Sequence, residues 1–235
     1  MFEIRRAQDR GVADFGWLDS RHTFSFGHYH DPRYMGFGPL RVINEDRVHP
    51  GRGFDAHRHQ HMEIITYVLD GAPEHRDSTG SGSVIRPGDV QRMSAGSGIV
   101  HSEFNASARE SAHFLQRWIL PGRRDLAPSY EKKHFSEPDK LGQWRPIGSA
   151  DGWEGSITIH QDVDLYATVL DPGQALSRHL SGKRKIWLQL VRGGPRVDGE
   201  ALSAGDGVVI QHNGSIALSA MSTAEFLLFD MADSP

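Results

Sequence analysis

Three histidines stand at every second position in the stretch HRHQHMEIITYVLDG, which begins at residue 57 and continues into a β-branched, apolar run. In a strand, residues two apart point to the same face, so His57 and His59 can direct two imidazoles at one point while the residue between them faces away. The stretch HSEFN repeats this arrangement with His101 and Glu103. Two such pairs on neighbouring strands would form a site of three imidazoles and one carboxylate that leaves coordination positions open, as a catalytic metal centre requires.

The same residues have a plainer explanation, because a histidine taken alone is more often a hydrogen-bonded surface or core residue than a ligand. An HxH pair followed by an HxE pair after a Pro-Gly-Asp turn favours the metal site. His61 and Glu63 would continue on the face of the first pair if the strand stayed regular, either as a further ligand or as a residue that supports the ligands. His28 and His30 form another HxH pair, but an Asp-Pro turn follows at once, and we expect them to be structural or part of a pocket rim.

Composition limits the classes of protein to consider. The chain has 235 residues, 37% of them hydrophobic, which is enough for a substantial core in a soluble globular protein. A formal net charge of -4 without a Lys/Arg run disfavours nucleic acid and membrane as partners. There is no cysteine, so a metal must bind to His and carboxylate. Because the first residues lack a signal-peptide pattern and no apolar stretch approaches membrane-spanning length, we expect a cytoplasmic protein.

The elements that would position these side chains are predicted to be strands. Short runs rich in Val, Ile, Tyr and Phe, such as PLRVINEDRV, EIITYVLDG, KIWLQLVRGG and AEFLLFDM, are separated by Gly, Pro, Asp and Ser. This pattern predicts an all-β fold of sandwich or barrel type. A short helical piece is expected within APSYEKKHFS, residues 127–136.

The chain also shows an internal repeat. YVLDG at 67–71 resembles QLVRGG at 189–194, and RPGDV at 86–90 resembles SAGDG at 203–207. Two related β modules are therefore predicted, with an approximate division into residues 1–128 and 129–235. The first match places His179 at the position of His57, Ser181 at that of His59 and Lys185 at that of Glu63, and the second places Leu218 and Ala220 at the positions of His101 and Glu103. The second module is thus expected to lack a metal site.

These motifs resemble those of a known family. GRGFDAHRHQHMEIITYVLDG resembles the first cupin motif, with its closing glycine one residue late, and GSGIVHSEFN resembles the second, with Gly96 in place of the usual proline. The stretches HTFSF, MGFGPLRVINED, EHRDS, RPGDVQRMSAGSGIVHSE, KIWLQLVRGG, LSAGDG and LLFDM resemble the pirin family of bicupins, specifically bacterial members regarded as quercetin 2,3-dioxygenases. The resemblance covers nearly the whole chain.

The resemblance implies two cupin barrels in one chain and a metal in the N-terminal barrel only. It implies His57, His59, His101 and Glu103 as the ligands, because in pirins the glutamate of the HSE motif takes the acidic position that ordinary cupins fill from the first motif. Glu63 is then expected to support the ligands rather than to bind the metal. His61 departs from the family pattern.

The function that the resemblance implies is a dioxygenase that opens the heterocycle of a flavonol such as quercetin with O2 and releases carbon monoxide. A flavonol would bind to the metal through its 3-hydroxyl oxygen, and Glu103 would accept the hydroxyl proton as the catalytic base. The expected cofactor is one divalent metal ion, Fe(II) in first place, although Ni, Cu, Co, Mn and Zn suit the same ligands. No organic cofactor is required.

Two alternatives stay open. The chain could be a metal-carrying, redox-responsive regulatory or protein-binding pirin without turnover, or its true substrate could be another enolic or phenolic compound. For the pocket, Phe24, Phe26, Met93 and Ile99 are candidates to stack on a flat polyphenol, or they are core residues. A fused pair of barrels is expected to be a monomer, because each barrel can cover the other.

Overall fold

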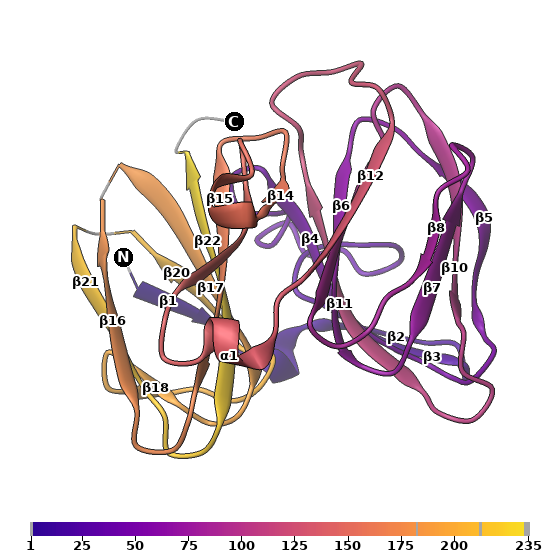
Figure 1. The fold of residues 1–235 in the computed structure, drawn as a ribbon. Coiled ribbons are helices and arrows are strands. Elements are labelled where there is room, and N and C mark those ends of the chain that lie inside the picture. Colours follow the sequence, from indigo (N-terminus) through magenta and orange to yellow (C-terminus); the bar gives the residue numbers. More distant parts are fainter. Residues whose placement is uncertain (1, 182, 212, 233–235) are drawn as a thin grey trace. The chain divides into compact units, whose positions relative to one another are not determined.

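The computed structural model describes residues 2–181, 183–211 and 213–232, and the regular elements of these residues are almost all antiparallel β-strands (Figure 1). The exceptions are one short helix, α1 (Glu137–Lys140), and two single 3-10 turns, η1 (Ala7–Asp9) and η2 (Trp153–Gly155). The prediction of an all-β protein is confirmed. In the described ranges no helix has the length and apolar character needed to cross a bilayer.

The chain divides into two compact units. The N-terminal unit comprises residues 11–134 and 157–161, and the C-terminal unit comprises 1–10, 135–156 and 162–235. The sequence predicts an approximate division after residue 128. Contacts instead group residues 129–134 with the N-terminal unit and residues 2–10 with the C-terminal unit, because the strands in these segments pair there.

The N-terminal unit is built from two sheets. The larger has the strand order β12-β9-β6-β11-β4-β3-β2, and the smaller has the order β5-β10-β7-β8. Its strands are β2 (Gly11–Asp14), β3 (Leu18–His22), β4 (Leu40–Val48), β5 (Gly53–His59), β6 (Glu63–Asp70), β7 (Pro73–Asp77), β8 (Gly82–Val84), β9 (Asp89–Ser94), β10 (Ile99–Asn105), β11 (Ala112–Ile119) and β12 (Ser129–His134), with the short β14 (Ile157–Thr158).

The C-terminal unit repeats this arrangement. Its larger sheet contains the order β1-β20-β17-β22-β15-β13, and its smaller sheet has the order β16-β21-β18-β19. Its strands are β1 (Phe2–Arg5), β13 (Arg145–Ser149), β15 (Val163–Leu170), β16 (Ala175–Leu180), β17 (Arg184–Arg192), β18 (Arg196–Val197), β19 (Glu200–Ala201), β20 (Gly207–Ile210), β21 (Gly214–Ser219) and β22 (Ala224–Ala232). Each strand of one smaller sheet has a counterpart at the same place in the other, so the predicted repeat is present in the topology.

The interiors of the two units differ in polarity. The C-terminal unit is filled by one large cluster of buried aliphatic and aromatic side chains from both of its sheets, including Leu188, Ile216, Leu218 and Phe226. In the N-terminal unit the apolar cluster around Leu18 closes only part of the interior, and polar residues are buried in the remainder. The N-terminal unit therefore has room for a polar site that the C-terminal unit fills with core.

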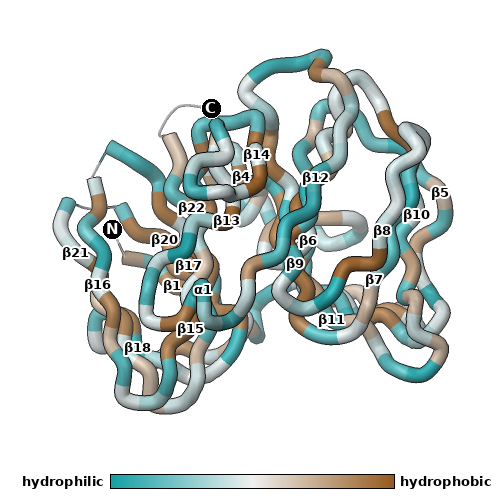
Figure 2. The backbone as a smooth tube through the Cα atoms, in the orientation of Figure 1, coloured by the Kyte–Doolittle hydropathy of each residue, from teal (hydrophilic) through white to brown (hydrophobic). Residues whose placement is uncertain are grey.

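The expected helical piece at residues 127–136 is not a helix. Ser129–His134 form β12, which pairs along its whole length with β9. Figure 2 shows β12 as a hydrophilic segment, in contrast to the hydrophobic β20. An edge strand that is exposed on one side needs few apolar residues, so its sequence did not distinguish a strand from a helix.

Candidate metal centre

Strands β5 and β10 bring the two predicted pairs of side chains together. The strands pair antiparallel, with His57 directly opposite His101 and His59 opposite Ile99. Around the histidines of both strands the burial alternates, so the imidazoles point inward while Arg58 and Val100 are exposed. Antiparallel neighbours on one face have Cβ atoms about 4.5–5.5 Å apart, which is why residues 44 positions apart in the chain can share one ion.

A bulge shapes the end of this strand pair. The register of β5 and β10 shifts between His101 and Glu103, so that Glu103 lies opposite Phe54. The backbones are close here, and a Cβ on Gly53 would lie 2.1 Å from the carbonyl oxygen of Glu103. Glycine at this position therefore allows the approach that carries Glu103 into the interior.

The three histidines form a compact group. The ring centroids of His57 and His101 are 4.4 Å apart, those of His57 and His59 are 4.8 Å apart, and those of His59 and His101 are 4.9 Å apart. One nitrogen from each ring lies within 4.8 Å of the other two. This spacing suits three ligands of a single ion.

Hydrogen bonds on the far sides of the rings fix which nitrogen faces the centre. Nδ1 of His57 lies 2.7 Å from the carbonyl oxygen of Asp55, an acceptor, so Nδ1 carries the proton and Nε2 keeps its lone pair. Nε2 of His101 is buried and has no hydrogen-bond partner among the described atoms. A buried, unpartnered imidazole nitrogen is costly unless a ligand or ion completes it.

A relay through His75 fixes His101. The carboxylate of Asp77 accepts a hydrogen bond from Nε2 of the fully buried His75 (3.0 Å), and Nδ1 of His75 lies 3.3 Å from Nδ1 of His101. In a neutral imidazole the second nitrogen is an acceptor, so His101 donates from Nδ1 and its Nε2 lone pair points at the centre. Supporting contacts of this kind orient metal-binding histidines in proteins generally.

Two of the imidazoles are held in the neutral form that binds metal. Burial, together with the neighbouring His57, lowers the pKa of His59 to about 4. Burial, followed by the neighbouring His57 and His59, lowers the pKa of His101 to about 2. Both rings therefore present lone pairs rather than protons near neutral pH.

Glu103 is positioned by a second relay. Trp118 Nε1 donates to Gln116 Oε1 (3.0 Å), and Gln116 Nε2 donates to Glu103 Oε2 (2.8 Å). Burial raises the pKa of Glu103, although the bond from Gln116 and the nearby His75 and His57 lower it in part. Ligand atoms of Glu103, His75 and His101 lie within 4.8 Å of one another. His101 belongs both to this group and to the group of three histidines.

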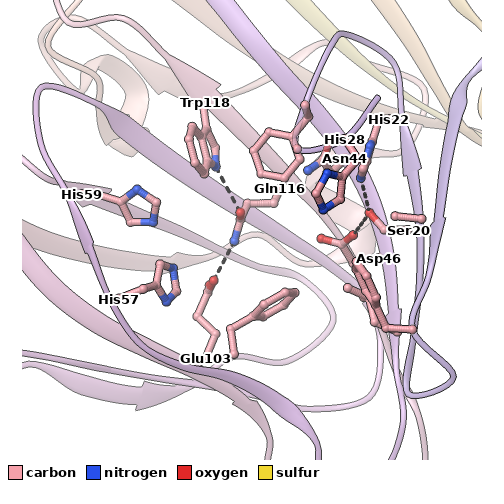
Figure 3. A pocket seen from close by; sticks show the side chains of 16 residues that line it. Ser20, His22, His28, Asn44, Asp46, His57, His59, Glu103, Gln116 and Trp118 are labelled. Carbon is pink, nitrogen blue, oxygen red and sulfur yellow. Dashed lines mark hydrogen bonds between the residues drawn. The ribbon is translucent and has the colours of Figure 1, made fainter. Parts of the chain in front are cut away.

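These side chains face a cavity of about 400 Å³, within the range of about 300–1,000 Å³ usual for small-ligand sites. Figure 3 shows His57, His59 and Glu103 on one side of it, and Ser20, His22 and Asp46 on the other. The walls between them are largely apolar. The lining residues are Ala13, Phe15, Leu18, Ser20, His22, Phe26, Gly27, His28, Asn44, Asp46, Phe54, His57, His59, Glu103, Gln116 and Trp118.

The other predicted site residues are dispersed. Phe26 and His28 line the cavity, and His30, the other histidine of that HxH pair, does not. Phe24 is buried without lining it, and Met93 and Ile99 pack in a separate apolar cluster.

His61 and Glu63 do not continue the face of the first pair, because β5 ends at His59. His61 adopts a left-handed backbone with φ 53°, and its ring lies 3.8 Å from the Asp125 carboxylate. The fully buried Glu63 begins β6 and accepts a hydrogen bond from His160 Nδ1 (3.1 Å). Neither residue lines the cavity.

Sequence reasoning missed several residues of this site. Gln116, Trp118 and the polar residues of β3 and β4 line the cavity, and His75 and Asp77 support it from behind. One signal was available, since Asn44 and Asp46 stand between Val42 and Val48 on the same face of a buried strand. Polar residues in the inward register of a strand indicate a site rather than core.

The donor set fits a divalent transition metal ion. Three imidazole nitrogens and a carboxylate suit Fe, Mn, Co, Ni, Cu or Zn, and the unpartnered Nε2 of His101 is one atom that such an ion would complete. The two hydrogen-bond relays hold His101 and Glu103 in place without an ion, so the site is preorganised for metal binding.

Family models and curated proteins match this chain over most of its length. A family model described as Pirin matches residues 3–119, and one described as the quercetinase C-terminal cupin domain matches residues 146–231. A quercetin 2,3-dioxygenase of Escherichia coli K12 is 42% identical over 231 residues, which cover 98% of this chain and 99% of that protein. A pirin-like protein of Caulobacter vibrioides is 39% identical and covers 94% of this chain and 96% of that protein.

Solved structures of related proteins also match this chain over nearly its whole length. The crystal structure of a bacterial pirin from Escherichia coli in complex with nickel(II) is 41% identical, covers 99% of each chain and superposes with a TM-score of 0.93. The prediction of two cupin barrels is confirmed by the family matches and the duplicated topology.

Proposed function

This chain belongs to the pirin family, and from that premise we propose that it is a metal-dependent dioxygenase that opens the heterocyclic ring of flavonols such as quercetin with O2 and releases carbon monoxide. The observation that carries the proposal is a cavity of about 400 Å³ that is lined by His57, His59 and the buried carboxylate of Glu103 and has largely apolar side walls. His101 completes the group of three imidazoles from behind His57 and His59. The name of the Escherichia coli relative supports the choice of substrate.

The metal would be held by His57, His59, His101 and Glu103. We propose Fe(II) as the native ion, and nickel(II) in the related pirin supports a site that also accepts other divalent ions. When bound, such an ion supplies Lewis-acid and redox chemistry at the open positions.

The chain's own residues bind and deprotonate the substrate. Phe26, Phe54 and Trp118 offer apolar surfaces that hold the flavonol rings and exclude water. Glu103 accepts the proton of the 3-hydroxyl group, which converts the flavonol into the electron-rich flavonolate that reacts with O2. Gln116 Nε2 donates to Glu103 Oε2, so this amide positions the carboxylate that accepts the proton.

The test combines metal content and turnover on one preparation. Elemental analysis of the purified protein is followed by an aerobic assay of quercetin loss, oxygen uptake and carbon monoxide release on the same sample. We expect about one divalent ion per chain and oxygen-dependent turnover that disappears after chelation. A fully loaded sample that leaves quercetin intact would contradict the proposal.

That contrary result would favour a second function. A metal-loaded chain without turnover would fit a redox-responsive pirin that acts through protein contacts. Membership of the pirin family supports this second function. A substrate panel that ranked another enolic or phenolic compound well above quercetin would retain the reaction class and change the substrate.

A further inference from the structure

The wall of the cavity opposite the histidines is polar, and the metal centre does not account for it. Ser20 and His22 on β3 and Asn44 and Asp46 on β4 all line the cavity, and each of the four is at most 4% exposed. Asp46 does not belong to either group of side chains that could hold an ion among the described residues. A buried carboxylate and a buried amide destabilise the fold unless hydrogen bonds satisfy them.

Strand register places these residues in two rows across the larger sheet. Ser20 lies opposite Asp46, and His22 lies opposite Asn44. Asn44 also lies opposite Gln116 on the next strand, β11. The second row therefore runs from His22 through Asn44 to Gln116, the residue that holds Glu103, so the polar wall and the metal centre are continuous parts of one cavity (Figure 3).

The row of Ser20 and Asp46 is preorganised. Ser20 Oγ donates to Asp46 Oδ1 (2.5 Å), and Nε2 of His22 lies 2.9 Å from Ser20 Oγ. Because the hydroxyl proton of Ser20 is directed to Asp46, the His22 ring donates to Ser20. Among the described side chains, Ser20 is the one that donates a hydrogen bond to Asp46, and it does so to Oδ1. The second carboxylate oxygen, Oδ2, is left to accept a hydrogen bond from a ligand.

Asn44 is incompletely bonded. Its Oδ1 is buried and has no hydrogen-bond partner among the described atoms. An unsatisfied buried acceptor costs roughly 1–3 kcal/mol, and such groups are rare in proteins unless a ligand or water completes them. Asn44 and Asp46 are two residues apart on one strand, so both side chains lie on the same face of the sheet, and both line the cavity.

We propose that Asn44 and Asp46 form a subsite that binds the hydroxyl groups of an aromatic ring remote from the metal, and that the protein thereby selects polyhydroxylated phenolic substrates. The proposal rests on the proposed function, which places the other end of the substrate at the histidines. Two neighbouring acceptors require a ligand that donates hydrogen bonds, and phenolic O–H groups do so. The apolar side chains between the two ends, among them Phe26 and Phe54, match the faces of the rings that join them.

The experiment measures binding without turnover. Quercetin is compared with 3-hydroxyflavone, which keeps the 3-hydroxyl group and lacks every other hydroxyl, by titration under anaerobic conditions at pH 8. The proteins are the metal-loaded wild type, Asp46→Asn and Asn44→Leu. Glu45→Gln is the matched control, because Glu45 lies between the two residues on β4, does not line the cavity and bonds to His113 instead.

We expect the wild type to bind quercetin at least tenfold more tightly than 3-hydroxyflavone, the gain of one or more hydrogen bonds to a charged or buried acceptor. Each of Asp46→Asn and Asn44→Leu should reduce this ratio by about fivefold or more, with 3-hydroxyflavone affinity changed less than about threefold. Glu45→Gln should retain the wild-type ratio. Equal affinities in the wild type, or an unchanged ratio in both variants, would overturn the subsite.

Failure of the subsite and failure of the proposed function give different results. If the wild type turns over both flavonols with equal efficiency and binds them equally, the dioxygenase stands and the subsite is wrong. If the binding ratio behaves as expected but neither flavonol is consumed in air by the loaded protein, the subsite stands and the proposed reaction is wrong.

Discussion

Glu103 has two roles in the proposed function, as a metal ligand and as the base that takes the hydroxyl proton. Replacing it with glutamine keeps the size and one coordinating oxygen but removes the basic carboxylate. We expect Glu103→Gln to keep much of its metal and to lose turnover by about a hundredfold or more, as for a positioned base. Metal content and oxygen-dependent quercetin loss are measured on one preparation. Gln116→Leu is the companion variant, in which the carboxylate remains but loses its donor. Near-normal turnover by the glutamine variant with metal retained would leave Glu103 as a ligand only.

Asp46 should make stability depend on pH. Burial raises its pKa from 3.8 to about 7, although the bond from Ser20 opposes this, while the charges of Glu103 and Glu45 reinforce it. The folded protein therefore holds a proton that the unfolded chain releases, so stability is greatest below about pH 4 for this group and falls as pH rises to 7. The shift corresponds to roughly 4 kcal/mol at most.

Asp46→Asn should remove this contribution. We expect the free energy of unfolding of the metal-free variant, measured by urea denaturation from pH 4 to 8, to decline less than that of the wild type. Parallel curves for the two proteins would show that Asp46 is ionised at no cost, against the burial that the structure gives it.

At the scale of elements, β7 supports the centre from behind through His75. His75→Leu keeps the volume roughly constant and removes the acceptor that orients His101. Loss of such supporting contacts typically weakens metal binding by about 10–100-fold, and we expect a loss in this range from competition with a chelator. His134→Leu, which removes a histidine exposed on β12, is the control for non-specific binding. Unchanged affinity in His75→Leu would mean that packing alone orients His101.

At the scale of the whole molecule, the duplication predicts one metal ion per chain. In the C-terminal unit Leu218 lies opposite Leu176, and both leucines pack in or against the apolar core. His179 is exposed at the end of the same strand, next to the buried Leu180. His59→Ala should therefore reduce the metal content from about one to near zero while the circular dichroism spectrum stays that of a β protein. His179→Ala should leave the content unchanged. A second tightly bound ion per chain would contradict this prediction.

The sequence by itself determined the fold class, the duplication and the pairs His57–His59 and His101–Glu103, because the period of two in a strand fixes which side chains share a face. It also related the chain to its family, since the motifs consist of contiguous residues. Features that depend on the residues of a single strand or motif could therefore be predicted.

The tertiary structure decided everything that required neighbours distant in the chain. Strand pairing placed Gln116 on Glu103, His75 on His101, and Asp46 beside Ser20. A backbone turn with φ 53° at His61 ended the strand and removed His61 and Glu63 from the site, although the periodicity alone would have continued it. Sequence spacing gives the direction of a side chain within one strand, but register, bulges and the opposing sheet determine what that side chain meets.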